Sequence, residues 1–172
     1  DMLLLFFVMT VGAVFKVAGA LSADSPYSNV GAQRELLQML AYEPLVILTF
    51  VGMSAATGSF MISDIYALDV PLLPHLPFLF IALGYALTIK LAKSPFDIAS
   101  CHHGHQEIVR GVLTDYSGPQ LALLEISHWL DVILLLGLCS LFWHTSITGM
   151  VVLLVLTYAL EIVVDNVCAR MT

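Results

Sequence analysis

The fold is decided by residues 119–164, PQLALLEISHWLDVILLLGLCSLFWHTSITGMVVLLVLTYALEIVV, where two apolar runs are separated only by the short turn WHTS. Each run has about the roughly 20 residues that an α-helix needs to cross a lipid bilayer. Because the connecting turn is so short, the two helices are expected to lie antiparallel to each other. The sequence therefore predicts a hairpin of transmembrane helices near 119–143 and 145–164.

The rest of the chain is similarly apolar. Hydrophobic residues make up 59% and charged residues 11% of the 172 residues, and the mean hydropathy is +0.94. Soluble domains average about 45–50% apolar and about 25% charged residues, so a soluble core of this size could not bury so much apolar surface. Further apolar runs near 2–22, 36–62 and 73–92 extend the hairpin to an all-α, polytopic membrane helix bundle. We expect about five transmembrane helices in a single membrane domain, residues 1–172.

The composition also excludes other classes of protein. Only six Lys and Arg are present, so the chain has no basic patch for nucleic acid. Its three cysteines, an odd number, give no disulfide framework. The chain begins at Asp1 rather than at Met, directly at a membrane segment, so we expect a fragment of a longer membrane protein.

The basic residues predict the orientation in the membrane. Alternating crossings place all of them on one side, while the opposite loop SDIYALDVPLLPH (63–75) contains none. Loops rich in Lys and Arg stay in the cytoplasm. We therefore expect the long loop 93–118 and the C-terminal end to be cytoplasmic. The basic residues behind this expectation are Lys16, Arg34, Lys90, Lys93, Arg110 and Arg170.

The long loop, KSPFDIASCHHGHQEIVRGVLTDYSG (93–118), is the most polar part of the chain. Ser94 as N-cap, Pro95 at the first helical position and Asp97 three residues after the cap form a partial capping box. A helix is expected from there to Arg110, with Gly111 just past its end.

Three interpretations of this polar helix remain open. It could be an interfacial helix with a wet face, or a metal site, although the Cys and His spacing matches no established zinc motif. It could also handle protons, because histidines change charge near neutral pH and neighbouring carboxylates favour the charged imidazolium. The groups concerned are Asp97, Cys101, His102, His103, His105 and Glu107.

Ionisable residues also occur inside the apolar runs, where they are functional candidates by default. Glu43 lies between Tyr42 and Pro44, and near the interface it could instead pair with Arg34. Glu125, His128 and Asp131 share one sector of their helix. Asp131 is 12 residues past Pro119, or about 18 Å along a helix, so it should be either protonated or paired.

These carboxylates have alternatives that the sequence leaves open. Asp131 could be a hydrogen-bonded packing residue between helices. Glu161 and Asp165 lie one turn apart on one face, where two negative charges would repel, and Asp165 could be solvated or paired with Arg170.

Several segments together resemble one family of membrane proteins. SPFDIASCHHGHQEIVRG followed by DYSG, with GAQRELLQMLAYEP, GSFMISDI and EIVVDNVCAR, is similar to the membrane subunit of energy-converting (group 4) NiFe hydrogenases, including formate hydrogenlyase. That subunit is homologous to the quinone-site subunit of respiratory complex I, the NADH dehydrogenase subunit 1 family. The likeness covers nearly the whole chain. The family has further helices at both ends, which agrees with a fragment.

The resemblance implies roles for individual residues. Glu43 looks like the buried glutamate of the family's lateral proton route. Asp97 and Glu107 look like members of its acidic funnel, which faces the electron-transfer arm. The stretch 115–118 matches a further part of that funnel. Complex I subunits have a shorter, glutamate-rich interval between the PFD and QE elements, whereas this chain has histidines there. The difference favours the hydrogenase branch over quinone binding.

Taken together, these observations define two sets of candidate residues and no metal ligand. The expected proton path consists of Glu43, Asp97, His103, His105, Glu107, Asp115, Glu125, His128 and Asp131. The expected docking loop includes Ser94, Arg110, Tyr116, Ser117 and Gly118.

Three functions remain for the chain at this point. The preferred one is the proton-translocating coupling subunit of a membrane-bound hydrogenase in the prokaryotic cytoplasmic (inner) membrane. It would contain no redox cofactor, and partner subunits would carry 4Fe-4S clusters and a NiFe site. The implied partners are the hydrogenase small and large subunits, an iron-sulfur subunit and antiporter-like membrane subunits. The alternatives are the quinone-site subunit of a complex I-like enzyme and a plain membrane anchor, for example for haem.

Overall fold

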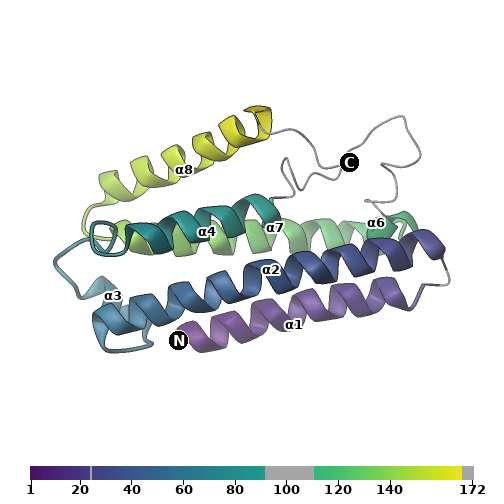
Figure 1. Ribbon diagram of the computed structural model, residues 1–172, viewed down its shortest axis with the longest axis horizontal. Coiled ribbons are helices and arrows are strands. Elements are labelled where there is room, and N and C mark those ends of the chain that lie inside the picture. The colour runs from purple at the N-terminus through teal and green to yellow at the C-terminus, as the bar shows by residue number, and fades with distance from the viewer. Residues whose placement is uncertain (24, 92–110, 168–172) are drawn as a thin grey trace.

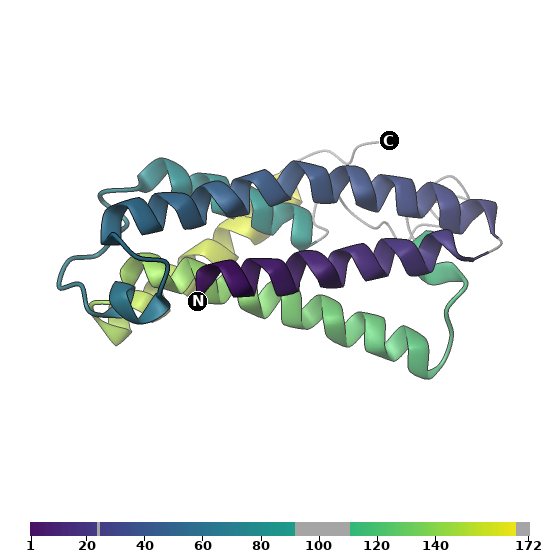
Figure 2. The same cartoon turned by 90° about the horizontal axis from the view of Figure 1, so that it is seen from below.

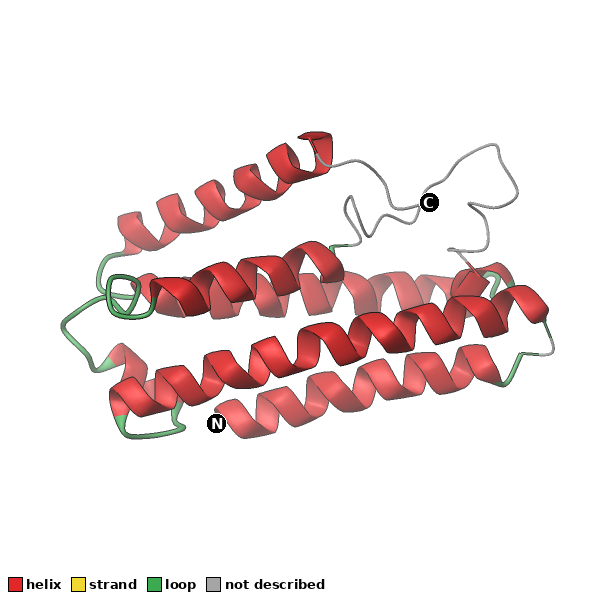
Figure 3. Ribbon diagram, viewed as in Figure 1, coloured by secondary structure: helices red, strands yellow, loops and turns green. Residues whose placement is uncertain are grey.

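A computed structural model describes residues 1–23, 25–91 and 111–167, and all regular structure within these ranges is helical (Figure 3). The long helices lie roughly along one direction, and α2 runs antiparallel to both α1 and α4 (Figures 1 and 2). They are α1 (Met2–Leu21), α2 (Pro26–Thr57), α4 (Pro77–Lys90), α7 (Pro119–Ser140) and α8 (Ile147–Val167). Short helices connect them: α3 (Ile62–Tyr66), α6 (Gly111–Thr114) and the 3-10 helix η2 (Leu141–Trp143).

The bundle has the properties of a polytopic membrane protein, as predicted. Among the described residues, four helices are long and apolar enough to cross a membrane, namely α1, α2, α7 extended to Trp143, and α8. Large apolar side chains cover their outer surfaces; Phe78 and Ile147, for example, are 83% and 78% exposed. In water such a surface would be strongly unfavourable, whereas lipid tails solvate it.

The second helix is displaced relative to the sequence prediction of 36–62. It begins ten residues earlier, at Pro26, because Ser25 is extended and proline suits the first helical position. It ends at Thr57, since Gly58 adopts a left-handed conformation with φ of 75°. The helix continues through Pro44.

The third predicted crossing, 73–92, is shorter in the structure. Its helix α4 has 14 residues and begins at Pro77, while turns occupy the proline-rich segment before it. At 1.5 Å per residue α4 is about 21 Å long, less than the roughly 30 Å hydrocarbon core. The last residue of α4, Lys90, consequently lies within the bundle at the level of Tyr42 rather than at its end.

The α7–α8 hairpin confirms the prediction from the opening stretch. The turn after η2 is fixed to the rest of the bundle by His144, whose Nε2 lies 2.7 Å from the carbonyl oxygen of Leu68. The Tyr66 ring also meets the His144 ring edge to face. These contacts attach the turn to the segment that follows α3.

The core joins four helices. Buried side chains of α1, α2, α4 and α7 form one apolar cluster, which includes Met9, Phe50, Leu83 and Leu138. A smaller cluster joins α1, α2 and α6 near Val17. Beside it, Oγ of the buried Ser28 donates a hydrogen bond of 2.8 Å to the carbonyl oxygen of Ala20, linking α2 to α1.

Candidate functional site

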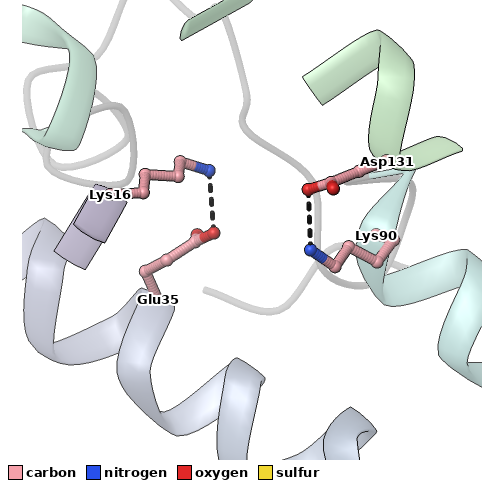
Figure 4. Close-up of polar contacts among 4 residues, drawn as sticks. All are labelled: Lys16, Glu35, Lys90 and Asp131. Carbon is pink, nitrogen blue, oxygen red and sulfur yellow. Dashed lines mark hydrogen bonds and ion pairs between the residues drawn. The ribbon is translucent and has the colours of Figure 1, made fainter. Parts of the chain in front are cut away.

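The most deeply placed charged contact of the described bundle joins α4 and α7. Nζ of Lys90 donates to Oδ2 of Asp131 at 2.9 Å (Figure 4). The Lys90 side chain is 9% exposed and that of Asp131 27%. The prediction that Asp131 would be either protonated or paired is therefore met by an ion pair. Removing ions from water is costly, and such a pair persists only where both charges compensate each other closely.

The aromatic ring of Tyr42 forms the other side of this contact. Nζ of Lys90 lies 4.7 Å from the ring centroid, within the range of a cation–π interaction. Tyr42 is buried on α2 and lies within electrostatic range of Lys90, Asp131 and its neighbour Glu43. One ammonium group is thus held between an α7 carboxylate and an α2 ring.

Glu43 follows Tyr42 along α2. Its Oε1 atom is buried and accepts no hydrogen bond from any described residue. The side chain borders an apolar groove of about 320 Å³ on α2, lined by Leu40, Glu43, Pro44, Ile47, Leu48 and Val51. The alternative pairing of Glu43 with Arg34 is not found in the structure, since the acidic partner of a described cation on this part of α2 is Glu35.

A second ion pair joins α1 and α2. Nζ of Lys16 lies 2.8 Å from Oε1 of Glu35, and both side chains are about 30% exposed. Figure 4 shows that the two ion pairs lie near each other, with one pair between α1 and α2 and the other between α4 and α7. Ionisable groups from four helices therefore meet in one region of the bundle.

His128 connects the two pairs electrostatically. Its half-buried ring lies within electrostatic range of Lys16 and Lys90, and of Glu125 and Asp131 on its own helix. The helical spacing that predicted a common sector for Glu125, His128 and Asp131 is consistent with this arrangement. The structure adds the two lysines that face this sector. We name the group formed by Tyr42, Lys90, Glu125, His128 and Asp131 the polar cluster.

The candidates near the start of α7 lie outside the polar cluster. Asp115, Ser117 and Gly118 are exposed in the turn between α6 and α7. The Tyr116 hydroxyl packs over Gly19 of α1, where an added Cβ would lie 2.8 Å from it. Gly118 has φ of 58°, a backbone conformation that glycine adopts readily.

Other candidates lie outside the described residues: Ser94, Asp97, Cys101, His102, His103, His105, Glu107 and Arg110. The proton, metal and interfacial interpretations of that interval stay predictions. The expected helix end is different, however. Gly111 is itself the first residue of helix α6, so it does not lie just past a helix. Among the residues that can be described, no group of three or more His, Cys, Asp or Glu could hold a metal ion.

Sequence reasoning missed two features of the site. Lys90 and Lys16 were considered only as markers of one membrane face, but both pair with carboxylates of neighbouring helices. Glu161 was not a candidate, yet it is 3% exposed and its Oε2 accepts no hydrogen bond from a described residue. A lysine inside the last turn of a predicted membrane helix, with a carboxylate on another run, was the available signal for the first of these.

Apolar helices that enclose ion pairs define a polytopic membrane protein with an ionisable interior, a class that includes ion-translocating subunits. Comparison with known proteins gives a more specific result. The sequence model of the family described as NADH dehydrogenase matches residues 1–172, and the chain belongs to this family.

Two curated relatives represent the two branches named by the sequence resemblance. The chain is 36% identical over 128 residues to hydrogenase-4 component C of Escherichia coli K12, covering 72% of this chain and 39% of the relative. It is 30% identical over 149 residues to a membrane relative from Geobacter metallireducens that is named as a subunit of NADH-quinone oxidoreductase, covering 83% and 44%. The chain thus spans about two fifths of the length of these relatives.

Proposed function

We propose that the chain is a membrane subunit of a complex I-like oxidoreductase, and specifically the proton-translocating coupling subunit of a membrane-bound hydrogenase complex. The observation that carries this proposal is the Lys90–Asp131 ion pair inside an otherwise apolar bundle. A membrane anchor has no need for such a pair, and desolvating its charges is unfavourable. Intramembrane ionisable groups that face the bundle interior are typical of proton relays.

Proton movement would use groups from α2 and α7. Glu125, His128 and Asp131 lie along one sector of α7, and Glu43 lies on α2 beside Tyr42, which is near Lys90. Each of these side chains except Tyr42 and Lys90 changes charge at an accessible pH in water. The buried Oε1 of Glu43 has no described donor, so this carboxyl is available to bind a proton.

The hydrogenase branch has two kinds of support. A relative at 36% identity is named hydrogenase-4 component C, and it covers 72% of this chain. In addition, residues 101–105 replace by histidines the glutamates found in complex I subunits, as described above. The quinone-site subunit of a complex I-like enzyme is the second candidate. It is favoured by the Geobacter metallireducens relative, whose name assigns it to an NADH-quinone oxidoreductase.

The remaining parts of the proposal concern orientation, partners and cofactors. The long loop 93–118 and the C-terminal end would face the cytoplasm of a prokaryote. That loop would dock the hydrogenase small subunit, with the large and iron-sulfur subunits beyond it. Antiporter-like membrane subunits would lie beside the bundle. Redox groups, 4Fe-4S clusters and a NiFe site, would belong to those partners and not to this chain.

The experiment uses the full-length subunit in its complete complex, in sealed inverted membrane vesicles. Asp131→Asn removes the carboxylate at nearly constant volume, and Asp69→Asn is the matched control at an exposed position. We expect Asp131→Asn to retain hydrogen evolution when an uncoupler is present but to lose most coupled proton uptake. Asp69→Asn should behave as the wild type. Normal proton uptake in Asp131→Asn would contradict a role for the polar cluster, and a quinone-dependent activity would favour the second candidate.

A further inference from the structure

Lys90 has two different neighbours for its single charge. The carboxylate of Asp131 lies at 2.9 Å, and the ring centroid of Tyr42 lies at 4.7 Å. The Lys90 side chain is nearly buried, with 9% exposure, so water compensates little of its charge. An ammonium group in such a place remains stable only while neighbouring protein groups balance it.

The surrounding groups come from every helix that faces this region. On α7, Asp131 pairs with Lys90 directly, and Glu125 and His128 lie further along the same sector. On α2, Tyr42 contacts Lys90, and Glu43 lies within electrostatic range of Tyr42. On α1, Lys16 is within range of His128 but is already paired, with Glu35 on α2. Glu43 is therefore a carboxyl group beside Tyr42 without a described cation of its own.

We propose that Lys90 is a positioning residue that determines which of two carboxyl groups, Asp131 or Glu43, is ionised. This inference rests on the proposed function, and it assigns to a lysine the linkage between the α7 and α2 parts of the proton path. Proton binding at Asp131 and proton release at Glu43 are thereby made to occur together.

The exchange conserves charge. While Asp131 is ionised, its carboxylate balances the Lys90 ammonium, and Glu43 holds a proton. When Asp131 binds a proton, the ammonium loses its counter-charge and its remaining described neighbour is the Tyr42 ring. A cation on that side favours the charged form of the adjacent Glu43 carboxyl, because opposite charges stabilise each other at short range. One proton enters at Asp131, one leaves Glu43, and Lys90 stays protonated throughout.

A purely structural role for Lys90 predicts different behaviour. If the ion pair only held α4 against α7, replacing both partners by neutral residues would retain function, because replacing a whole buried pair is often tolerated. The ring of Tyr42 would then be irrelevant to coupling. In the exchange described here, both the positive charge and the aromatic ring are required.

The experiment measures protons moved per hydrogen evolved, as a function of pH, in vesicles that contain the complete complex. Lys90→Met removes the charge but retains an apolar stem, and Lys90→Arg retains the charge. Tyr42→Leu removes the ring, and Tyr42→Phe retains it. Hydrogen evolution in the presence of an uncoupler reports how much complex is assembled. A double variant, Lys90→Met with Asp131→Asn, tests the structural role.

We expect Lys90→Met to lower the coupling ratio at least about ten-fold and to move the acid side of its pH profile upward by roughly 1–3 units, because Asp131 loses its cation. Lys90→Arg and Tyr42→Phe should retain most of the coupling, whereas Tyr42→Leu should lose it. The double variant should assemble and remain uncoupled. If Lys90→Met does not assemble, the two Tyr42 variants decide the question.

Two results would overturn the inference while leaving the proposed function intact. They are normal coupling in Tyr42→Leu, and normal coupling in the double variant. A wild-type complex that evolves hydrogen without moving protons would instead overturn the proposed function, and the inference with it.

Discussion

Gly52 of α2 lies directly against Leu79 of α4, so closely that a Cβ added to Gly52 would overlap Cδ1 of Leu79. This contact lies toward the ends of the two helices near α3, and the Tyr42–Lys90 contact lies at the other end of α4. Because α2 and α4 are antiparallel, the two contacts together fix how α4 lies along α2 (Figure 1). The absence of a side chain at Gly52 thereby helps to position Lys90 beside Tyr42.

Gly52→Val should push α4 away from α2. We expect a loss of about 1–3 kcal/mol in the free energy of unfolding, the usual cost of overpacking. Gly12→Val is the matched control, because no atom lies within 4 Å of a Cβ added there. Unfolding in detergent by denaturant would compare the two variants. Equal stabilities would show that α2 and α4 do not depend on this close approach.

The apolar runs were sufficient to predict the membrane bundle and its last hairpin, because about 20 apolar residues in succession have few alternatives to a crossing. Helix ends were less accessible. The start of α2 was placed too late because residues 26–35 include Asn29, Gln33, Arg34 and Glu35 and look like a polar loop. The start of α4 was placed too early because hydropathy ignores how prolines interrupt helical hydrogen bonds.

The candidate site was accessible only in part. Helical periodicity places Glu125, His128 and Asp131 together because they are near one another in sequence. The partner of Asp131 is 41 residues away, on another helix. No local pattern specifies which helices pack together or at what height. Lys90 therefore looked like a residue flanking a loop, although it completes the ion pair.

The histidines of the long loop provide a separate prediction. Replacing His103 and His105 together by Gln should shift the pH dependence of coupled hydrogen production, because glutamine cannot bind a proton near neutral pH. No metal should be lost, which metal analysis of the purified complex would check. Stoichiometric loss of zinc or iron with otherwise normal coupling would instead support the metal interpretation of Cys101, His102, His103 and His105.

The central claim is that protons cross the membrane through this subunit, and Glu43→Gln tests it most directly. Glutamine has nearly the same shape as glutamate but cannot ionise. The measurement is proton uptake into sealed vesicles during hydrogen production by the complete complex, relative to hydrogen evolved. We predict normal assembly, normal hydrogen evolution with an uncoupler, and loss of most proton uptake. Unchanged proton uptake per hydrogen would contradict the account and leave Glu43 as a structural residue.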